Sequence, residues 1–341
     1  MADLDVLVAG GGPAGLVTAL YAQRAGLRVA VAEPREAPID KACGEGLMPA
    51  AVRALTDLEV PIDGRTFRGI RYCDGTRSAV ADFADGGGLG VRRLELHERL
   101  HHAVLARGIE LIPRRVTDVE QDATGVRAAG VRARYLVAVD GLHSALRREL
   151  GLQRPPRGRP RWGIRAHYAV APWTDHVEVH WAARCEAYMT PVGPDCVGVA
   201  VLGSDRAPLD RQLAAFAQLI ERLPAAPVDR ARGAGPLRQD VAGRVAGRVL
   251  LVGDAAGYVD ALTGEGLALG FGCAQALVAR LVAGNPAAYE GDYRRLSRRY
   301  RWITGTLLAA ASRPALRKHL VPTAARAPAL FRAAVRQLGE C

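Results

Sequence analysis

The stretch Leu4-Asp5-Val6-Leu7-Val8-Ala9-Gly10-Gly11-Gly12-Pro13-Ala14-Gly15, at the start of the chain, decides the fold. Its apolar first half predicts a buried strand, and the apolar residues that follow Gly15 predict a helix. Gly10 allows the tight turn, Gly12 lets the backbone approach a pyrophosphate, and Gly15 lets helix and strand pack closely. Strand, glycine turn and helix in this order predict a dinucleotide-binding unit.

The second predicted strand supports the same interpretation. Residues Arg28 to Ala32 are mostly apolar, and Glu33 follows them. An acidic side chain at this place accepts hydrogen bonds from the ribose hydroxyls of an adenosine and repels a 2′-phosphate. The free amides and the positive dipole end of the first helix would bind the phosphates. The alternative is a glycine turn that binds no ligand. Glu33, at the position where dinucleotide-binding units carry an acidic residue, argues against it.

The composition is that of an ordinary globular protein. The chain has 341 residues, of which 49% are hydrophobic and 24% charged, and this length suits two domains or one elaborated domain. No apolar run reaches the roughly eighteen residues that span a bilayer. The acidic start is unlike a signal peptide, so we expect a cytoplasmic protein.

The net charge of +11 is concentrated towards the C-terminal end. From residue 288 onward, eleven basic residues stand against three acidic ones. Such basic, proline-interrupted helices either lie on an anionic membrane as a peripheral contact or form a solvated layer over the cofactor domain, and the second case is the commoner. Nearly all basic residues of the chain are arginines, which is typical of codon bias, and we expect no nucleic-acid partner.

Two further glycine–aspartate motifs extend the dinucleotide-binding unit. Tyr135 to Val139 is an apolar run of the kind found in buried parallel strands, and Asp140-Gly141 follows it. Arg248 to Val252 is similar, and Gly253-Asp254 follows it. A loop, Leu262-Thr263-Gly264-Glu265-Gly266, then precedes a long helix. The nucleotide-binding domain is therefore predicted to be discontinuous.

Between these motifs the pattern becomes that of antiparallel strands. Trp162 to Leu202 alternates over several strands, and Arg68 to Tyr72 with Ser78 to Phe83 alternates like a hairpin. The predicted fold class is α/β, with a Rossmann-like cofactor domain, an inserted antiparallel β-sheet substrate domain and a helical C-terminus. The expected ranges are 1–67, 91–151 and 241–286 for the cofactor domain, 68–90 for the hairpin of the substrate sheet, 152–240 for the substrate domain and 287–341 for the C-terminal helices.

Together the motifs give a resemblance to a known family. With the glycine fingerprint ending at Glu33, the D-G motif at Asp140 with Ser144 and Arg147, and the G-D motif at Asp254, the chain resembles the flavoproteins of the para-hydroxybenzoate hydroxylase fold. Within them it is similar to the branch of geranylgeranyl reductases, flavin halogenases and small monooxygenases. The resemblance covers the first three quarters of the chain and implies a glutathione-reductase-type domain that binds FAD.

The resemblance also implies which residues bind this cofactor. They come from all parts of the discontinuous domain: Gly10, Gly12, Pro13, Ala14 and Gly15 for the pyrophosphate, Glu33 and Arg35 for the adenosine ribose, Arg93 for the flavin chain, the backbone of Val116 for adenine, Asp254 for the ribitol, and the amides of Gly264, Gly266 and Leu267 for the pyrimidine edge of the flavin. A helix N-terminus at that edge would stabilise the negative charge of reduced flavin. Val116 is expected on a strand that runs to Glu120, and a plain helix N-cap is the alternative role of Asp254.

Departures from the patterns of the family bear on the activity. The chain lacks a second dinucleotide fingerprint, so NAD(P)H has no domain of its own, and it lacks the C-x-x-x-x-C pair of disulfide reductases. The halogenase W-x-W-x-I-P motif is missing. The reductase Y-x-W-x-F-P motif is present only as Tyr188-Met189-Thr190-Pro191-Val192-Gly193, without its tryptophan and phenylalanine.

The resemblance therefore implies an FAD-dependent oxidoreductase, first of all an NAD(P)H-dependent monooxygenase. Such an enzyme would transfer oxygen from dioxygen to a hydrophobic aromatic or polyketide-like small molecule held under the substrate sheet. Two alternatives stay open. One is a geranylgeranyl-reductase-type enzyme that reduces isoprenoid C=C bonds, and the other is a flavin-binding protein without turnover.

Two residues are candidates for catalysis. Cys43, in Cys43-Gly44-Glu45-Gly46, resembles the cysteine that lies near the flavin in the reductase branch, and a small buried hydrophobic residue is an equal alternative. Tyr188 shares a strand face with Glu186, and either side chain could exchange a proton in a cavity.

A third group was considered as a metal site. His176, Glu178 and His180 share one strand face, where period-two alternation places them. We expect no metal, because no third His or Cys ligand is nearby in the sequence. The six cysteines are scattered without metal-ligand spacing, which is typical of reduced thiols in a cytosolic chain.

Overall fold

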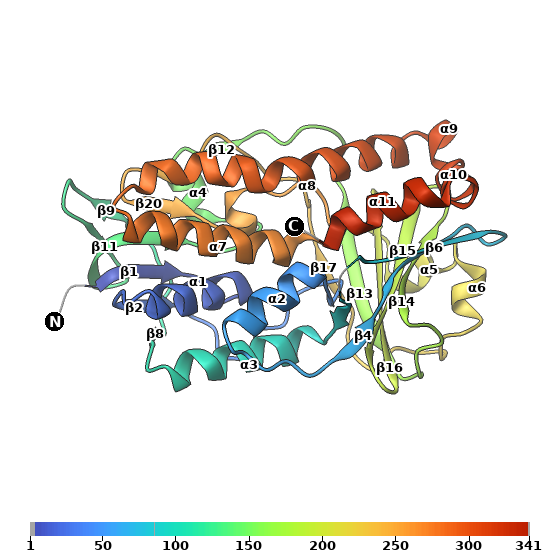
Figure 1. Cartoon of the computed structure of the whole chain (residues 1–341), viewed down its shortest axis with the longest axis horizontal. Coiled ribbons are helices and arrows are strands. Elements are labelled where there is room, and N and C mark those ends of the chain that lie inside the picture. The colour runs from blue at the N-terminus through green and yellow to red at the C-terminus, as the bar shows by residue number, and fades with distance from the viewer. Residues whose placement is uncertain (1–3, 85, 340–341) are drawn as a thin grey trace.

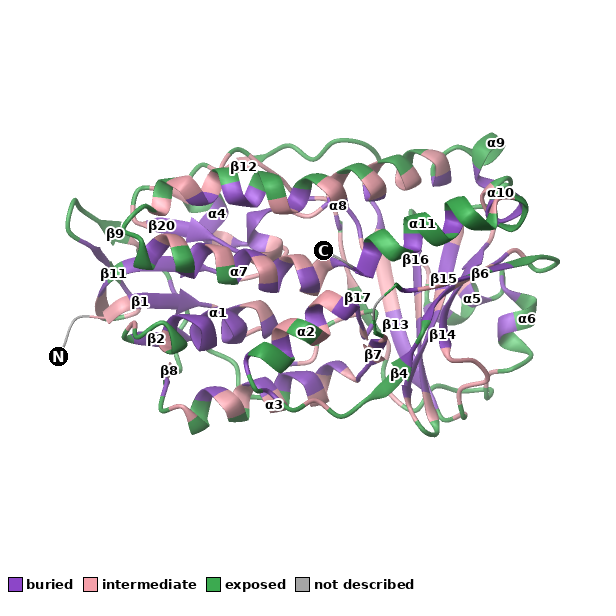
Figure 2. Ribbon diagram, in the orientation of Figure 1, coloured by how far each residue is buried: buried purple, intermediate pink, exposed green. Residues whose placement is uncertain are grey.

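Two sheets lie side by side along the molecule (Figure 1), and the computed structural model describes residues 4–84 and 86–339. In the first sheet, β1 (Leu4–Ala9) lies parallel between β11 (Val131–Ala138) and β2 (Val29–Ala32). The full order is β19 (Val245–Ala246), β20 (Val249–Leu251), β11, β1, β2 and β8 (Glu110–Ile112), with β10 (Val126–Ala128) on β11 and β9 (Glu120–Gln121) on β10. Figure 2 shows this sheet buried in the molecule, as expected of apolar strands covered on both faces.

Helices complete the cofactor domain. α1 (Pro13–Arg24) follows the glycine turn and packs against both α3 (Arg93–Ala106) and α7 (Gly266–Val282). α1 begins at Pro13, where proline is favoured because the first helical N–H has no partner within the helix. The shorter elements are α2 (Pro49–Asp57), α4 (Ala145–Glu149) and the 3₁₀ turns η1 (Gly253–Ala256) and η2 (Pro286–Ala288).

The second sheet contains the strands expected to form the substrate domain. Its order is β17 (Arg232–Ala234), β13 (Trp162–Tyr168), β16 (Cys196–Gly203), β15 (Cys185–Gly193), β14 (His176–Trp181), β5 (Gly69–Cys73) and β6 (Ser78–Asp82). Neighbours are antiparallel except β14 and β5, and the predicted hairpin of β5 and β6 is present. Two small sheets complete the strands: β3 (Gly46–Leu47), β7 (Gly88–Gly90) and β4 (Arg65–Phe67) in one, and β12 (Gln153–Arg154) with β18 (Asp240–Val241) in the other.

The two faces of the second sheet pack against different helices. Ala187, Met189 and Val199 point to a cluster with α5 (Leu209–Leu213) and α6 (Ala217–Ile220). Val179 and Trp181 point the other way, to a cluster with the C-terminal helices. These helices are α8 (Tyr289–Ala311), α9 (Pro314–Arg317), α10 (Leu320–Arg326) and α11 (Pro328–Gly339). Among the described residues, no helix combines the length and apolar character that crossing a bilayer requires.

The strand expected from Val116 to Glu120 is wrong. Val116 is buried but lies outside any strand, and β9 begins only at Glu120. Asp118 adopts a φ of 54°, a left-handed conformation that a strand cannot contain. The role of Val116 towards adenine and the expected domain ranges stay predictions.

Candidate functional site

Two glycines of the turn have no room for a side chain, and a third faces open space. A Cβ on Gly15 would lie 1.9 Å from the Gly10 carbonyl oxygen, and one on Gly10 would lie 2.4 Å from the Val139 carbonyl oxygen. Gly10 also has a φ of 120°, which side chains rarely allow. At Gly12 the nearest atom to a Cβ is Arg93 Nη2, 3.8 Å away. The space over Gly12 is therefore free to receive a ligand.

Glu33 lies at the edge of this turn, as predicted. Its Oε2 accepts a hydrogen bond of 2.9 Å from the Gly11 amide, and its Oε1 accepts one of 2.7 Å from Arg35 Nε. Burial alone would raise the pKa of Glu33, but the hydrogen bonds from Arg35 and Gly11 hold that pKa below its usual value. The carboxylate is therefore ionised beside the turn, where it can bind a ribose.

Arg93 brings a buried positive charge to the same place. The residue is 7% exposed, and its Nε has no hydrogen-bond partner among residues 4–84 and 86–339. Burial lowers the pKa of Arg93, an effect that Cys43, Asp254 and Glu45 oppose. Buried charges are normally paired. An unpartnered guanidinium nitrogen beside an open glycine turn fits an anionic ligand such as FAD.

His97 was missed by the sequence analysis. It is buried on α3, and its Nε2 lies 2.8 Å from the carbonyl oxygen of Gly11. Burial lowers the pKa of His97 to about 4, so the ring is neutral at physiological pH and Nε2–H donates to Gly11. A lone histidine in an amphipathic helix carries no sequence signal for this contact.

Arg147 connects the two aspartate motifs. It is 1% exposed, and its Nη1 donates hydrogen bonds of 3.1 Å to the carbonyl oxygens of both Asp254 and Ala255. Its Nη2 donates to the Leu142 carbonyl oxygen at 2.9 Å and to Gln239 Oε1 at 2.8 Å. This one side chain therefore fixes the loop after β11 relative to the loop after β20.

Asp254 lies in η1, and the N-cap of that turn is Val252, so the N-cap alternative for Asp254 is wrong. Burial raises the pKa of Asp254, while Lys41, Arg93 and Arg147 oppose that rise. A cavity between η1 and α7 is lined by Asp254, Tyr258 and Gly266, among others. The contact of this carboxyl group with a ribitol hydroxyl stays a prediction.

The loop before α7 has the backbone that its glycines require. Gly264 adopts a φ of 71°, and a Cβ there would lie 2.7 Å from Met48 Cε. The helix then starts at Gly266, so the amides of Gly264, Gly266 and Leu267 lie at the N-terminus of a 17-residue helix. The amides of Gly266 and Leu267 have no acceptor within the helix and carry its positive dipole end, whereas the Gly264 amide donates to the Ala261 carbonyl oxygen at 3.1 Å. Their role towards the flavin stays a prediction.

The structure brings both catalytic candidates to one face of the second sheet. Cys43 Sγ accepts a 3.4 Å hydrogen bond from the Glu45 amide, and burial raises the pKa of this thiol. Thr190 on β15 donates to the Gly44 carbonyl oxygen at 2.9 Å. Tyr188, two residues earlier on the same strand face, donates to the Leu262 carbonyl oxygen at 2.9 Å. The Cys43 loop and the loop before α7 therefore both meet β15.

Glu186 is less suited to proton exchange than its position on the strand suggested. It is fully buried and forms ion pairs with Arg161 and with Arg317, the latter at 2.7 Å. Burial raises the pKa of Tyr188 well above its usual value, so its hydroxyl stays protonated. Of the two side chains, Tyr188 alone keeps an exchangeable proton.

The sequence analysis also missed a polar cluster beneath the Cys43 loop. His167 Nε2 lies 2.5 Å from Glu45 Oε2, and His167 Nδ1 lies 2.6 Å from Asp229 Oδ2. Arg165 lies beside both carboxylates. Glu45, His167 and Asp229 come from distant parts of the chain. The one local signal was Glu45 between two glycines, and its φ is 60°.

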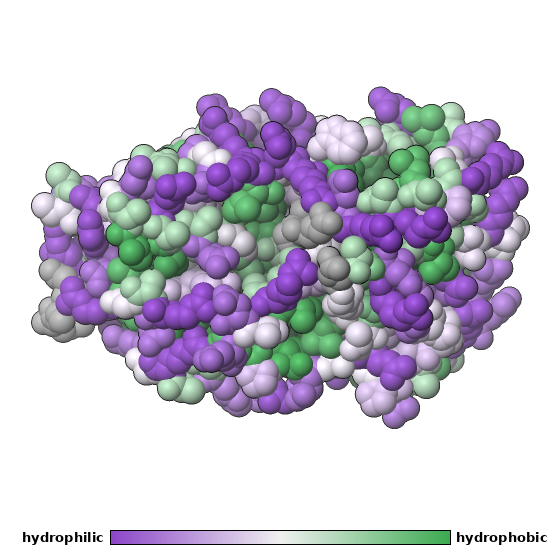
Figure 3. All heavy atoms as spheres, in the orientation of Figure 1, coloured by the Kyte–Doolittle hydropathy of each residue, from purple (hydrophilic) through white to green (hydrophobic). Residues whose placement is uncertain are grey.

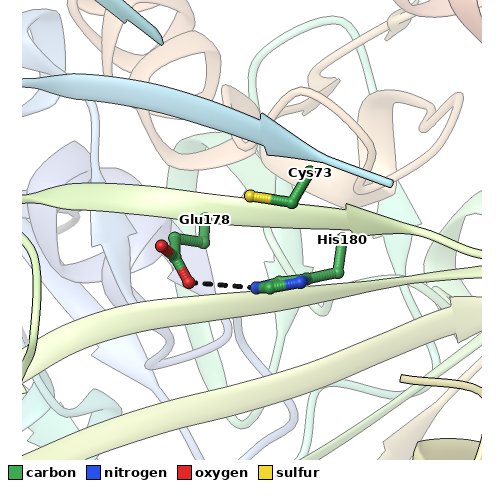
Figure 4. Close-up of side chains that lie close together, drawn as sticks. All are labelled: Cys73, Glu178 and His180. Carbon is green, nitrogen blue, oxygen red and sulfur yellow. Dashed lines mark hydrogen bonds and ion pairs between the residues drawn. The ribbon is translucent and has the colours of Figure 1, made fainter. Parts of the chain in front are cut away.

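The reason given for expecting no metal at His180 and Glu178 is wrong. Cys73, opposite His180 on the neighbouring strand β5, lies with them (Figure 4), and the three potential ligand atoms are within 4.8 Å of one another. However, Glu178 already accepts hydrogen bonds from His180 at 3.0 Å and Trp173 at 3.1 Å, and Arg71 lies 3.4 Å away. Burial raises the pKa of Cys73 to about 12. We therefore interpret the cluster as a buried group whose polar atoms are hydrogen-bonded to one another and to neighbouring side chains, without a metal.

Comparisons with known proteins identify the family of the chain. The family described as FAD binding domain matches residues 5–63. A menaquinone reductase of Mycobacterium tuberculosis is 30% identical over 307 residues, which cover 78% of this chain and 73% of that protein. Digeranylgeranylglycerophospholipid reductase 1 of Methanopyrus kandleri is 31% identical over 297 residues, with 78% and 76% covered. The chain belongs to the geranylgeranyl reductase and flavin monooxygenase branch of the FAD-dependent oxidoreductases.

Solved structures share the fold of this flavoprotein. The flavin-dependent brominase Bmp2 superposes with a TM-score of 0.81 at 19% identity and covers 100% of this chain and 94% of its own. PqsL of Pseudomonas aeruginosa, a probable FAD-dependent monooxygenase, gives a TM-score of 0.76 at 20% identity, with 93% and 99% covered. The predicted fold class and the FAD cofactor are confirmed.

Proposed function

We propose that this flavoprotein reduces carbon–carbon double bonds of an isoprenoid lipid, and that NAD(P)H reduces its FAD. The relatives of at least 30% identity over three quarters of the chain carry the names of reductases, one for menaquinone and one for a digeranylgeranyl lipid. This was the first alternative to the monooxygenase in the sequence analysis. The single observation that carries the proposal is an apolar cluster next to the flavin site.

That cluster is continuous from the flavin end of the molecule to its C-terminal helices. Met48 and Leu262 lie at the flavin end, Val179 and Trp181 lie on β14, and Phe331 lies on α11. A polyprenyl chain has no polar groups, so its site must be lined by apolar side chains. The residues of this cluster pack against one another in the structure, and we propose that they are the side chains that would contact such a substrate.

Outside this cluster, three large apolar side chains of the C-terminal helices are exposed. Trp302 is 69% exposed, Leu330 67% and Leu316 47%. Figure 3 shows hydrophobic residues gathered at the upper right of the molecule, where Figure 1 places α8, α9 and α10. Apolar side chains at this end, among basic ones, suit a substrate that arrives from a lipid surface.

When bound, FAD supplies a group that accepts a hydride and gives it up again. The residues of the chain would hold it in the way described above. Glu33 and the glycine turn would bind the adenosine and phosphates, Arg93 would neutralise negative charge, and the α7 N-terminus would stabilise the reduced flavin. The Cys43 loop and Tyr188 on β15 would lie on the substrate side of this site.

The monooxygenase remains the second candidate, because one observation favours it. The tryptophan and phenylalanine of the reductase Y-x-W-x-F-P motif are replaced by Thr190 and Val192. The same FAD-binding residues would serve a monooxygenase, which needs dioxygen in addition. Its substrate would be the hydrophobic aromatic or polyketide-like molecule first expected.

A test separates the two candidates. The FAD-loaded protein is reduced with dithionite under argon and mixed with geranylgeranyl diphosphate, which has no quinone ring to accept electrons, and the flavin absorbance is followed. We expect the substrate to reoxidise the flavin without dioxygen. Reoxidation that requires air, combined with a gain of one oxygen atom in the substrate, would establish the monooxygenase instead.

A further inference from the structure

We propose that Asp229, His167 and Glu45 form a proton relay that leads from solvent to the Cys43–Gly46 loop at the flavin site. Two carboxylates contact the two ring nitrogens of one buried histidine, at 2.6 Å from Asp229 and 2.5 Å from Glu45. Contacts this short are hydrogen bonds, so a proton lies in each gap. A histidine bridged in this way can take a proton on one nitrogen and release one from the other.

One end of the relay, Asp229, is partly exposed to solvent, and the other end, Glu45, is buried. The Asp229 side chain is 25% exposed, whereas those of His167 and Glu45 are 2% and 1% exposed. The carboxylate of Glu45 is fixed by a 2.7 Å hydrogen bond from the Arg93 backbone amide, and the Glu45 amide contacts Cys43 Sγ. Protons can therefore enter at Asp229 and reach a carboxylate held by the Arg93 amide, in a residue whose own backbone amide contacts Cys43.

The strand register places His167 and Glu45 on the face of the second sheet that also carries Tyr188. His167 lies opposite Gly198, and Gly198 lies opposite Thr190, the residue that holds Gly44. These residues share a face with Tyr188. A Cβ on Gly198 would come within 3.0 Å of Glu45 Oε2, so the absence of a side chain there leaves room for the carboxylate.

The charged groups around His167 keep protons in the relay. Glu45 and Asp229 face its two nitrogens, Arg165 lies beside it on β13, and Arg92 at the start of α3 lies 3.6 Å from Asp229. Arg165 Nη1 is 3.3 Å from His167 Nδ1 and 3.2 Å from Asp229 Oδ2. The contact of Nδ1 with Asp229 is the shorter of the two, so the hydrogen bond on this side of the ring joins Nδ1 and Asp229.

The proposed reaction consumes the proton that such a relay delivers, and in this respect the inference rests on the proposed function. Reduction of a C=C bond takes a hydride from the flavin, which brings both electrons to one carbon, and a proton for the other carbon. Glu45 gives its proton to the carbon and takes the Nε2 proton of His167, Nδ1 of His167 takes a proton from Asp229, and Asp229 recovers one from water. His167 and Asp229 act through Glu45 and are positioning residues.

His167→Gln is the decisive variant, because glutamine still donates a hydrogen bond to Glu45 but cannot relay a proton. We expect it to bind FAD and be reduced by dithionite like wild type. Turnover of the isoprenoid substrate should fall about 100-fold, the lower range for acid–base catalysis. Its solvent isotope effect and pH dependence should change as well. Asp229→Asn, which interrupts the relay at its partly exposed end, should have the same effects.

His180→Gln is the matched control. His180 is a buried histidine that contacts Glu178 at 3.0 Å on the opposite face of the same sheet (Figure 4). This variant should lose similar stability but keep the turnover, isotope effect and pH profile of wild type. If His167→Gln matched His180→Gln in all three, the role of His167 would be structural and the relay would be refuted.

Proton NMR of the unreacted protein is independent of any substrate. We expect an imidazole proton far downfield of the amide region, absent from His167→Gln and Asp229→Asn and retained in His180→Gln. Absence of that signal from wild type overturns the relay. If the signal is present but no isoprenoid is reduced, the proposed function fails alone. The pH dependence of flavin reoxidation by dioxygen, which also consumes a proton, then decides for or against the relay in the same variants.

Discussion

At the scale of single residues, two glycines of the same turn should respond differently to alanine. Gly12→Ala places its Cβ in open space, with φ of −71° and ψ of 172° that alanine adopts freely. We expect an unchanged melting temperature of the FAD-free protein but an affinity for FAD at least about tenfold lower, because the backbone can no longer approach the pyrophosphate. Thermal unfolding and a fluorescence titration with FAD measure the two effects.

Gly15→Ala is the comparison for that experiment. Its Cβ would lie 1.9 Å from the Gly10 carbonyl oxygen, so strand and helix must separate. The FAD-free protein should lose about 1–3 kcal/mol in its free energy of unfolding, the usual cost of overpacking. Equal effects of the two variants on the FAD-free protein would contradict the assignment of Gly12 to the ligand.

Arg147 tests whether the two aspartate motifs depend on one side chain. Arg147→Met removes the donors to Asp254, Ala255, Leu142 and Gln239 and leaves buried acceptors unpaired. The free energy of unfolding in urea should fall by about 3 kcal/mol or more. Arg148→Met, at an exposed neighbour, should change it little. Similar losses in both variants would show that Arg147 has no special role.

At the scale of elements, the contact between α3 and the glycine turn should depend on pH. The pKa of His97 is lowered from 6.5 to about 4 by burial, so the unfolded chain binds a proton more readily than the native protein between these values. The free energy of unfolding therefore falls as the pH drops from 6.5 towards 4. In His97→Gln this part of the pH dependence should vanish. Chemical denaturation at several pH values measures it, and an unchanged slope would refute the assignment.

Elements that follow from local pattern were predictable, and contacts between distant elements were not. The order of β1, α1 and β2 follows from an apolar run, a glycine turn and a second apolar run. The strand at Val116 failed because the positive φ of Asp118 has no clear sequence signal. The metal argument counted ligands along one strand and missed Cys73, which parallel pairing brings opposite His180.

The candidate site shows the same division. Gly10, Glu33 and Asp254 lie in motifs whose spacing is fixed by local backbone geometry. Glu45 and His167 are 122 positions apart and meet because β13 and the Cys43 loop pack together. Tertiary packing of this kind leaves no periodicity in the sequence.

At the scale of the whole molecule, the C-terminal helices should bind a lipid surface. Trp302 and Leu330 are exposed among arginines, and each arginine near an anionic surface contributes about 1 kcal/mol. We expect the protein to co-sediment with phosphatidylglycerol vesicles and much less with neutral ones. The double substitution Trp302→Ser and Leu330→Ser should weaken this binding without loss of FAD. No difference between anionic and neutral vesicles would contradict the prediction.

The central claim is that this flavoprotein reduces isoprenoid double bonds, and the mass of the product tests it most directly. The FAD-loaded protein is supplied with NADPH and menaquinone in vesicles, under argon and in air, and the extracted lipid is oxidised back to the quinone before its mass is measured. The account predicts a product that has gained two hydrogen atoms under both conditions. A lipid that is unchanged under argon and gains an oxygen atom in air would contradict it.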